Sequence, residues 1–246
     1  MGLRETRSTM GMPVTVELSG RGSSEDIDAV FSYLDSIDRR FSTYKRDSEI
    51  SALNRGSVSE PSPEMREIFA IAERTKLETG GFFDIRRPDG ALDPSGVVKG
   101  WAILNAARLL TSRGCEDFYV DAGGDIQPSG KNDAGKEWTV GIRNPFAGSG
   151  IIKVIRPGGS GVATSGSYER GGHIYNPHAP GTELDAIISI TVLGPDVLEA
   201  DRFATAAFAM GRRGIGFIES LAGFEGYAVD KDGIATMTSG FESYAL

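Results

Sequence analysis

The sequence has little cysteine and histidine and lacks a long apolar run. Cys115 is the only cysteine, so an internal disulfide is impossible and a cluster of thiolate metal ligands is excluded. The first residues lack the apolar core of a signal peptide, and no later segment approaches a membrane span. We therefore expect a soluble, cytoplasmic protein. A periplasmic or membrane-anchored protein is the alternative if a leader has been removed.

Basic residues are also in the minority. Lys and Arg number 26 against 34 Asp and Glu, so the formal net charge is −8. Nucleic-acid binding needs basic surface that neutralises phosphates, so this composition disfavours a general nucleic-acid binder. An anionic small molecule is compatible with it, because a metal ion or a helix N-terminus supplies positive charge locally.

The hydrophobic pattern predicts helices and strands that are interspersed without regular β–α–β spacing. No linker, charge block or repeat divides the chain, so we expect a single domain over residues 1–246. The fold class is α+β with largely antiparallel pairing. Helical spacing covers 23–41, 61–81, 96–114 and 199–211; strands are expected at 13–18, 117–126, 137–145, 148–157 and 186–195, with a terminal hairpin over 223–241.

The segment EADRFATAAFAMG, residues 199–211, combines an apolar composition with two polar side chains. Asp201 and Thr205 are four residues apart, so they share one face of the predicted helix. Their oxygens are hard ligands that suit Mg²⁺ or Ca²⁺. The alternative is a buried aspartate that bonds the backbone, with the threonine bonded to the carbonyl four residues earlier.

Two glycine-containing segments are candidates for phosphate contact. LDPSGVVKGWA, residues 92–102, turns into a helix with Lys99 in its first turn, where free N–H groups and a point charge suit a phosphate. VDAGGDI, residues 120–126, lets the backbone approach a ligand closely. The alternatives are an ordinary capped helix and a tight turn between strands.

The loop GVATSGSYERGGHIYNPHAPG, residues 161–181, holds both histidines of the chain, His173 and His178. A histidine is a potential general base near neutral pH. The alternative is a polar hairpin loop whose Ser and Thr satisfy turns. Elsewhere, Met10 and Tyr44 either belong to the core, which base rates favour, or pack on a flat ring.

Each of these signals is weak alone, but their order is specific. The series MGM-P, FSTY with SEISALN, GGFFD, DPSGVVKG, DAGGDI, GIRNP, ATSGSYERGGHIYNP and ADRFATAAFAMG runs from Met10 to Gly211. It resembles the ApbE family, the FAD:protein FMN transferases. The resemblance implies two α+β halves of T-fold type with FAD in the cleft between them. It also implies Mg²⁺-dependent transfer of FMN from FAD to a Thr or Ser hydroxyl of a client protein, with release of AMP.

The resemblance also implies site residues. The metal ligands match the side chains of Asp201 and Thr205 and the backbone carbonyl of Val98. His173 is expected to deprotonate or place the client hydroxyl, with Asp201 as the second candidate base. Lys99 is expected to compensate phosphate charge. Flavin, adenine and reaction-site contacts are expected from Met10, Tyr44, Asp84, Trp101, Thr164, Ser165 and Tyr175.

The chain departs from the family pattern at two places. The family's D-L-G-G is D-P-S-G here, which changes the turn before Val98. An insertion that usually follows F-D is missing, so the chain runs from Asp84 to Asp93 through the short segment IRRPDGAL. Two other hypotheses are a Mg²⁺-dependent FAD pyrophosphatase and a flavin-binding protein without turnover. Oxygen ligands also serve Mn²⁺ and Ca²⁺.

Overall fold

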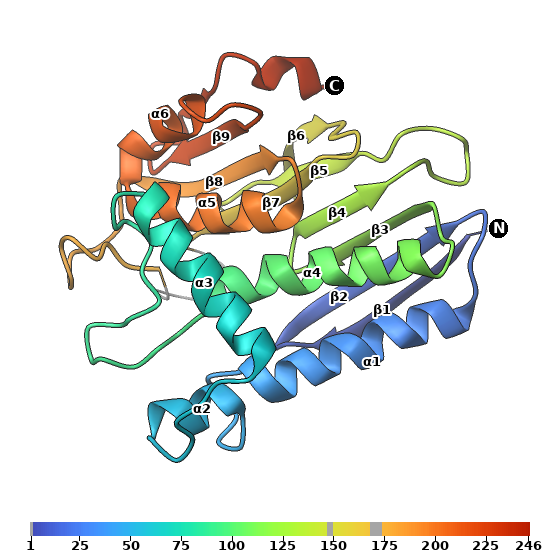
Figure 1. Cartoon of the computed structure of the whole chain (residues 1–246). Coiled ribbons are helices and arrows are strands. Elements are labelled where there is room, and N and C mark those ends of the chain that lie inside the picture. The colour runs from blue at the N-terminus through green and yellow to red at the C-terminus, as the bar shows by residue number, and fades with distance from the viewer. Residues whose placement is uncertain (1, 147–149, 168–173) are drawn as a thin grey trace.

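The computed structural model describes residues 2–146, 150–167 and 174–246. Eight of the described strands form one antiparallel sheet in the order β1-β2-β3-β4-β7-β8-β9-β10, and β5 and β6 form a separate pair (Figure 1). The strands are β1 Leu3–Thr9, β2 Met12–Ser19, β3 Asp117–Ala122, β4 Asp125–Ser129, β5 Val140–Arg143, β6 Ile151–Ile155, β7 Gly161–Gly166, β8 Ile187–Gly194, β9 Glu225–Asp230 and β10 Ala235–Met237.

The α-helices lie between the strand pairs in sequence. They are α1 Ser24–Phe41, α2 Glu49–Asn54, α3 Pro63–Glu78, α4 Ser95–Ser112, α5 Val197–Ala209 and α6 Gly214–Glu219. None of these described helices combines the length and the apolar run that a membrane span requires.

The order of elements repeats along the chain. In the first half, β1 and β2 precede α1–α4, and β3 and β4 follow; in the second half, β7 and β8 precede α5 and α6, and β9 and β10 follow. The two halves of the sheet join where Ile126 of β4 pairs with Val162 of β7. This arrangement confirms the predicted α+β class with antiparallel sheets and two similar halves, although the sheet is continuous.

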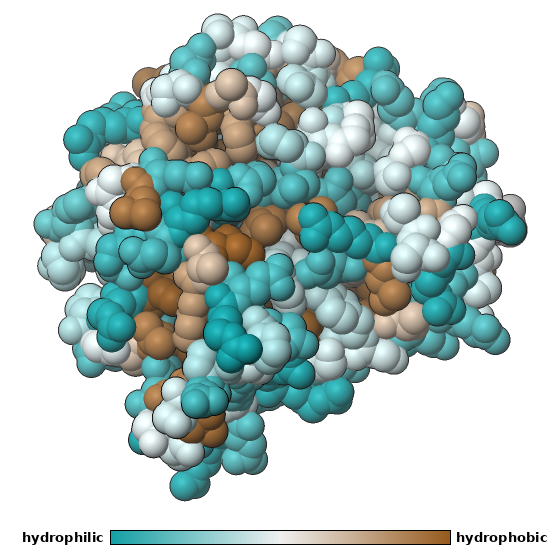
Figure 2. Space-filling model, viewed as in Figure 1, coloured by the Kyte–Doolittle hydropathy of each residue, from teal (hydrophilic) through white to brown (hydrophobic). Residues whose placement is uncertain are grey.

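The helices cover one face of the sheet. α1 begins with a capping box, in which the Asp26 side chain accepts the Ser23 N–H, and its apolar residues Ile27, Val30 and Leu34 are fully buried. α4 and α5 pack side by side across the two halves (Figure 1). Seen from this side, the surface is largely hydrophilic, and apolar residues show mainly in its recesses (Figure 2). The helices therefore supply the cover that a half-buried sheet needs.

The opposite face of the sheet is only partly covered. The β5–β6 hairpin packs on β7–β9 through Val140, Ile142 and Ile155. Beside the hairpin, β1–β3 present polar side chains, including Glu17 and Tyr119, as an antiparallel sheet with one solvated face does. The pairing of β5 with β6 confirms the two strands predicted there.

Part of the segment that was predicted as a loop forms a central strand of the sheet. GVATSG, residues 161–166, forms β7 between β4 and β8. Its small and polar residues gave no strand pattern. They are tolerated because α5 lies directly on this strand: a Cβ on Gly161 would fall 2.0 Å from the Val197 backbone nitrogen. The prediction missed this packing, which exists only in the tertiary structure.

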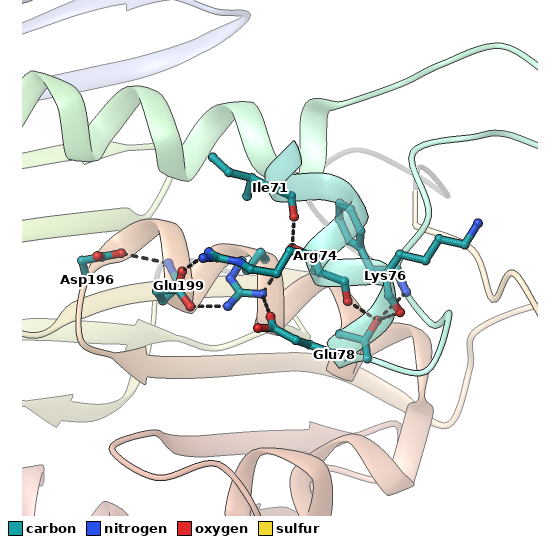
Figure 3. Close-up of polar contacts among 10 residues, drawn as sticks. Ile71, Arg74, Lys76, Glu78, Asp196 and Glu199 are labelled. Atoms are coloured by element: carbon teal, nitrogen blue, oxygen red, sulfur yellow. Dashed lines mark hydrogen bonds and ion pairs between the residues drawn. The ribbon is translucent and has the colours of Figure 1, made fainter. Parts of the chain in front are cut away.

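An ion-pair network ties α3 to α5. Arg74 and Glu78 of α3 point toward α5, where Arg74 lies 2.9 Å from Glu199 (Figure 3). Arg202, which is 3% exposed, contacts both Glu78 and Glu199 and stacks 3.9 Å from the Phe203 ring. Because α3 leads into the GGFFD segment and α5 carries Asp201, this network fixes the distance between two walls of the site described next.

Candidate functional site

A cavity of about 460 Å³ opens where α4 begins, beside α5 and the end of β7. Segments far apart in the sequence meet there, and polar residues are prominent among them. The lining residues are Tyr44, Phe82, Phe83, Asp84, Arg87, Pro88, Asp93, Ser95, Gly96, Lys99, Thr164, Ser165, Gly166, Ile174, Tyr175, Pro177, Asp201 and Thr205. The first turn of α4 borders this space, where the Ser95 N–H donates to Asp93 Oδ1 and the positive end of the helix dipole favours a negatively charged group.

The floor of the cavity depends on a close contact between α4 and α5. The Gly100 N–H donates a hydrogen bond to Asp201 Oδ2 at 2.8 Å. A Cβ on Gly100 would lie 2.8 Å from Asp201 Cβ and 2.9 Å from both the Leu198 Cα and the Val197 carbonyl oxygen. Only glycine at this position lets the two helices approach closely enough for that hydrogen bond.

Replacing Gly100 with alanine is therefore expected to push α4 away from α5. Overpacking of this kind costs about 1–3 kcal/mol, which lowers the melting temperature by several degrees in a chain of this size. Gly216→Ala is the matched control, since Gly216 is helical and has no atom within 4 Å of an added Cβ. There we expect unchanged or slightly raised stability. Equal melting temperatures for the two variants would show that α4 and α5 do not depend on glycine at position 100 for their close approach.

Lys99 lies between two buried carboxylates. Its Nζ is 2.6 Å from Asp125 Oδ2 and 3.6 Å from Asp201 Oδ1, and both aspartates are almost fully buried. Burial raises the pKa of Asp201 to about 7; the Lys99 ammonium opposes that rise, and the Asp125 carboxylate adds to it. Two acids facing one ammonium leave this cluster with a net negative charge when both are ionised, which attracts a further cation.

Asp125 also joins the two halves of the sheet. Its Oδ1 accepts the backbone N–H of Thr164 at 3.0 Å, while its other oxygen holds Lys99 of α4. Asp125 was not among the site residues predicted from the sequence. The sequence signal that could have indicated Asp125 is its position directly after the glycine pair in DAGGDI. A strand begins there, and the Asp125 side chain lies on the face of the sheet that the helices cover.

A smaller hollow of about 60 Å³ adjoins the cavity and is lined largely by apolar residues, including Met10, Met12 and Phe41. Met10 has φ of 53°, an uncommon conformation for a residue with a side chain, in the two-residue turn between β1 and β2. Tyr44 lines both spaces and is 92% exposed. An exposed ring beside an apolar hollow suits a flat aromatic ligand group.

Comparison with known proteins identifies the family of this chain. The family model described as "ApbE family" matches residues 10–87 and 86–228. The chain belongs to the ApbE family.

Curated relatives in this family share about a quarter of their residues with the chain. The FAD:protein FMN transferase of Vibrio cholerae is 26% identical, over 76% of this chain and 74% of the relative. The FAD:protein FMN transferase of Escherichia coli is 24% identical, over 88% of this chain and 80% of the relative. The family assignment therefore extends over most of both sequences.

Solved structures show the same fold. The flavin transferase ApbE from Vibrio cholerae superposes with a TM-score of 0.86 over 99% of both chains, at 24% identity. The ApbE protein from Thermotoga maritima gives a TM-score of 0.89 over 100% of both chains, at 20% identity. The ApbE fold predicted from the sequence is thus confirmed.

The ApbE fold brings the predicted metal ligands to the α4–α5 contact. Asp201 and Thr205 line the cavity from successive turns of α5. Val98 lies in the first turn of α4, buried and two residues before Gly100. Among the described residues, no three His, Cys, Asp or Glu side chains form a metal-binding group. A cation here would therefore depend on Asp201 together with hydroxyl and carbonyl oxygens.

The predicted cofactor contacts divide into two groups. Lys99, Tyr44, Ser165, Asp84 and Tyr175 line the cavity. The Asp84 carboxylate is held by Lys76 Nζ at 2.7 Å, and the hydroxyl of Tyr175 lies against backbone carbonyls. The Asp84 carboxylate and the Tyr175 hydroxyl therefore already have partners within the protein. His173, the predicted base, lies outside the described residues.

Two other expected contacts point away from the cavity. Trp101 is buried among the helices, where its Nε1 donates to Glu67 and its ring packs edge-on against Phe41, and it lines neither hollow described here. The structure thus places Trp101 in the core. The Thr164 hydroxyl bonds Thr191 across neighbouring strands, and pairing with β4 places it on the sheet face away from the helices. At this position the backbone of Thr164 borders the cavity.

Asn54 is a further residue without an assigned role in the sequence analysis. Its side-chain amide donates to the Leu92 carbonyl at 2.9 Å, and its oxygen accepts the Leu92 N–H at 2.8 Å. It is the last residue of the SEISALN motif, which explains why that motif ends on an amide. Asn54 pins one end of the short segment between Asp84 and Asp93.

Proposed function

We propose that this chain is an FAD:protein FMN transferase, as its curated relatives are named. The hydroxyl oxygen of a client Thr or Ser attacks the FMN-side phosphorus of FAD and forms a phosphoester. The bond from that phosphorus to the bridging oxygen breaks, and AMP leaves with the bonding electrons. The proton of the hydroxyl passes to a base. FAD is thus a substrate, and the client protein keeps the FMN.

The observation that carries this proposal is the Lys99–Asp125–Asp201 cluster at the N-terminus of α4. A pyrophosphate brings negative charge to a site that must neutralise it before a hydroxyl can approach. The positive end of the α4 dipole and the Lys99 ammonium provide positive charge on one side of the cavity. The two carboxylates provide the negative charge that would hold a metal ion on the other.

The residues fit a divalent cation, and we propose Mg²⁺. The Asp201 carboxylate is buried with incomplete charge compensation, and Thr205 faces the same space from the next helical turn. With the Val98 carbonyl, they form the oxygen donor set that a hard cation prefers. When bound, the ion would neutralise the pyrophosphate and stabilise the leaving AMP. Gly100 orients Asp201 for this through its N–H, independent of the ion.

The proton of the client hydroxyl needs an acceptor, and His173 remains our predicted base. Asp201 is the alternative, since a carboxyl with a pKa near 7 is suited to proton transfer at neutral pH. Tyr44 and the apolar hollow beside Met10 are proposed to hold the flat rings of FAD. Ser165 would lie beside the reacting phosphorus.

The test is the fate of FAD in the presence of Mg²⁺ and a co-expressed flavoprotein client. A mass spectrum showing an FMN adduct on Thr or Ser, with AMP in equal amount, is the expected result. AMP and free FMN without an adduct would instead identify an FAD pyrophosphatase. Tight FAD binding without AMP release would identify a flavin-binding protein and rule out the transferase.

A further inference from the structure

Residues 175–178 lie against the GGFFD segment and the residues that follow it. The Tyr175 hydroxyl lies 3.1 Å from the Asp84 carbonyl oxygen and 3.0 Å from the Arg86 carbonyl oxygen, so its hydrogen is shared between two backbone acceptors. Desolvation raises the pKa of this tyrosine, which keeps the hydroxyl protonated and able to donate. These residues are about ninety positions apart in sequence, so the contact is purely tertiary.

His178 makes a second crossing contact a few residues later. Its Nε2 lies 2.9 Å from the Gly80 carbonyl oxygen, so this nitrogen carries a hydrogen and donates. Its ring packs edge-on against Phe82 with centroids 4.6 Å apart. A Cβ on Gly81 would lie 3.3 Å from the ring, so the glycine makes room for it. Asn176 orients the turn by accepting the His178 N–H.

The segment that these side chains hold is a wall of the cavity. Phe82, Phe83 and Asp84 line the cavity directly. The short segment that follows folds back on itself, because the Asp93 N–H donates to the Ile85 carbonyl and the Arg87 N–H donates to the Ala91 carbonyl. Asn54 fixes its far end at Leu92. Tyr175 fixes its near end.

We propose that Tyr175 and His178 are positioning residues for FAD. Together they hold residues 80–86 in place as a wall of the cavity, at the point where the family's usual insertion is missing from this chain. Tyr175 bonds the backbone of Asp84 and Arg86, where the segment that is shortened in this chain begins. Both side chains are proposed to act through this wall rather than on the reacting atoms. The choice of FAD as the ligand rests on the proposed function, whereas the role of the two side chains in holding residues 80–86 does not.

Tyr175→Phe keeps the ring and removes the hydrogen bond, so it tests the positioning role. We expect the KM for FAD to rise about fivefold, with kcat within about twofold of wild type, because one hydrogen bond is lost and the chemistry is untouched. Tyr175→Phe combined with His178→Phe should raise KM further. Tyr119→Phe, on the opposite face of the sheet, is the matched control and should leave both constants unchanged.

Limited trypsin digestion without FAD tests the structural part alone. Arg86 is exposed in the held segment, and cleavage after it requires the segment to leave its place. We expect Tyr175→Phe to speed this cleavage about fivefold and the double variant to speed it more. Wild-type cleavage rates would overturn the proposal, as would faster cleavage with an unchanged KM. If the wild-type protein itself binds no FAD, the proposed function fails, whereas the cleavage rates still decide whether the two side chains hold the wall.

Discussion

Asp201→Asn is expected to abolish flavin transfer and at the same time to stabilise the metal-free protein above neutral pH. Activity should fall at least a thousandfold, by order of magnitude, because the proposed cation loses its charged ligand. Stability should rise because the wild-type carboxyl, with a pKa of about 7, is forced to ionise while buried. The asparagine amide can still accept the Gly100 N–H and donate toward Asp125.

The pH dependence of this effect follows from the direction of the pKa shift. A folded-state pKa above the unfolded value means that the native state binds the proton more tightly, so stability is lost as the pH rises from about 4 to about 7. A shift of about three units corresponds to about 4 kcal/mol at most. The variant lacks this loss, so its advantage in melting temperature should grow between pH 5 and pH 8, toward an order of 10 °C.

The measurement is thermal unfolding across that pH range, with and without Mg²⁺. The cation should raise the melting temperature of the wild-type protein and leave that of Asp201→Asn unchanged. Asp230→Asn is the matched control: hydrogen bonds from the Ile234 and Asp232 N–H groups lower the pKa of this aspartate, which is 6% exposed, so its neutralisation should destabilise the protein at pH 8. A variant at position 201 that melts below wild type at pH 8 would contradict the account of the charged cluster.

Lys99→Met is expected to have the largest effect on stability. Without the ammonium, Asp125 and Asp201 remain as two buried carboxylates that face each other, and loss of one partner of a buried ion pair costs about 3–5 kcal/mol. The melting temperature at pH 8 should fall by an order of 10 °C. Differential scanning calorimetry measures this directly.

Asp125→Asn in the Lys99→Met background should recover much of that loss, because one of the two carboxylates becomes neutral while the hydrogen bond to the Thr164 N–H is kept. Lys153→Met is the control, since its ion pair with Glu242 is at the surface and contributes at most about 1 kcal/mol. Additive effects of the two core substitutions would show that Lys99 and Asp125 are not coupled.

Periodicity predicted most helices and strands of this fold. The apolar spacing of α1, α3 and α4 and the alternation in β2 are local signals that the chain carries without its partners. The Asp232-Gly233 turn between β9 and β10 also follows from two residues. β7 was missed because its GVATSG sequence becomes a strand through packing between neighbouring strands and α5.

The candidate site divides in the same way. The helical spacing of Asp201 and Thr205 and the order of the family motifs were readable in the sequence, and the structure places both side chains in the cavity. Trp101 lies in the core instead of lining the cavity, because a motif position does not say which side of a helix faces the ligand. Asp125, Asn54 and the crossing contact of Tyr175 could not be inferred, because each joins segments distant in the chain.

The sequence by itself thus determined the family, the α+β class and the residue types of the proposed oxygen-ligand site, since these depend on local spacing and on the order of motifs. Only the tertiary structure decided which charges meet. Lys99 faces Asp125 and Asp201 because Gly100 lets α4 and α5 approach closely and because β4 and β7 pair at Ile126 and Val162. Burial then gives those charges their energetic weight, because a carboxylate removed from water depends on its few neighbours.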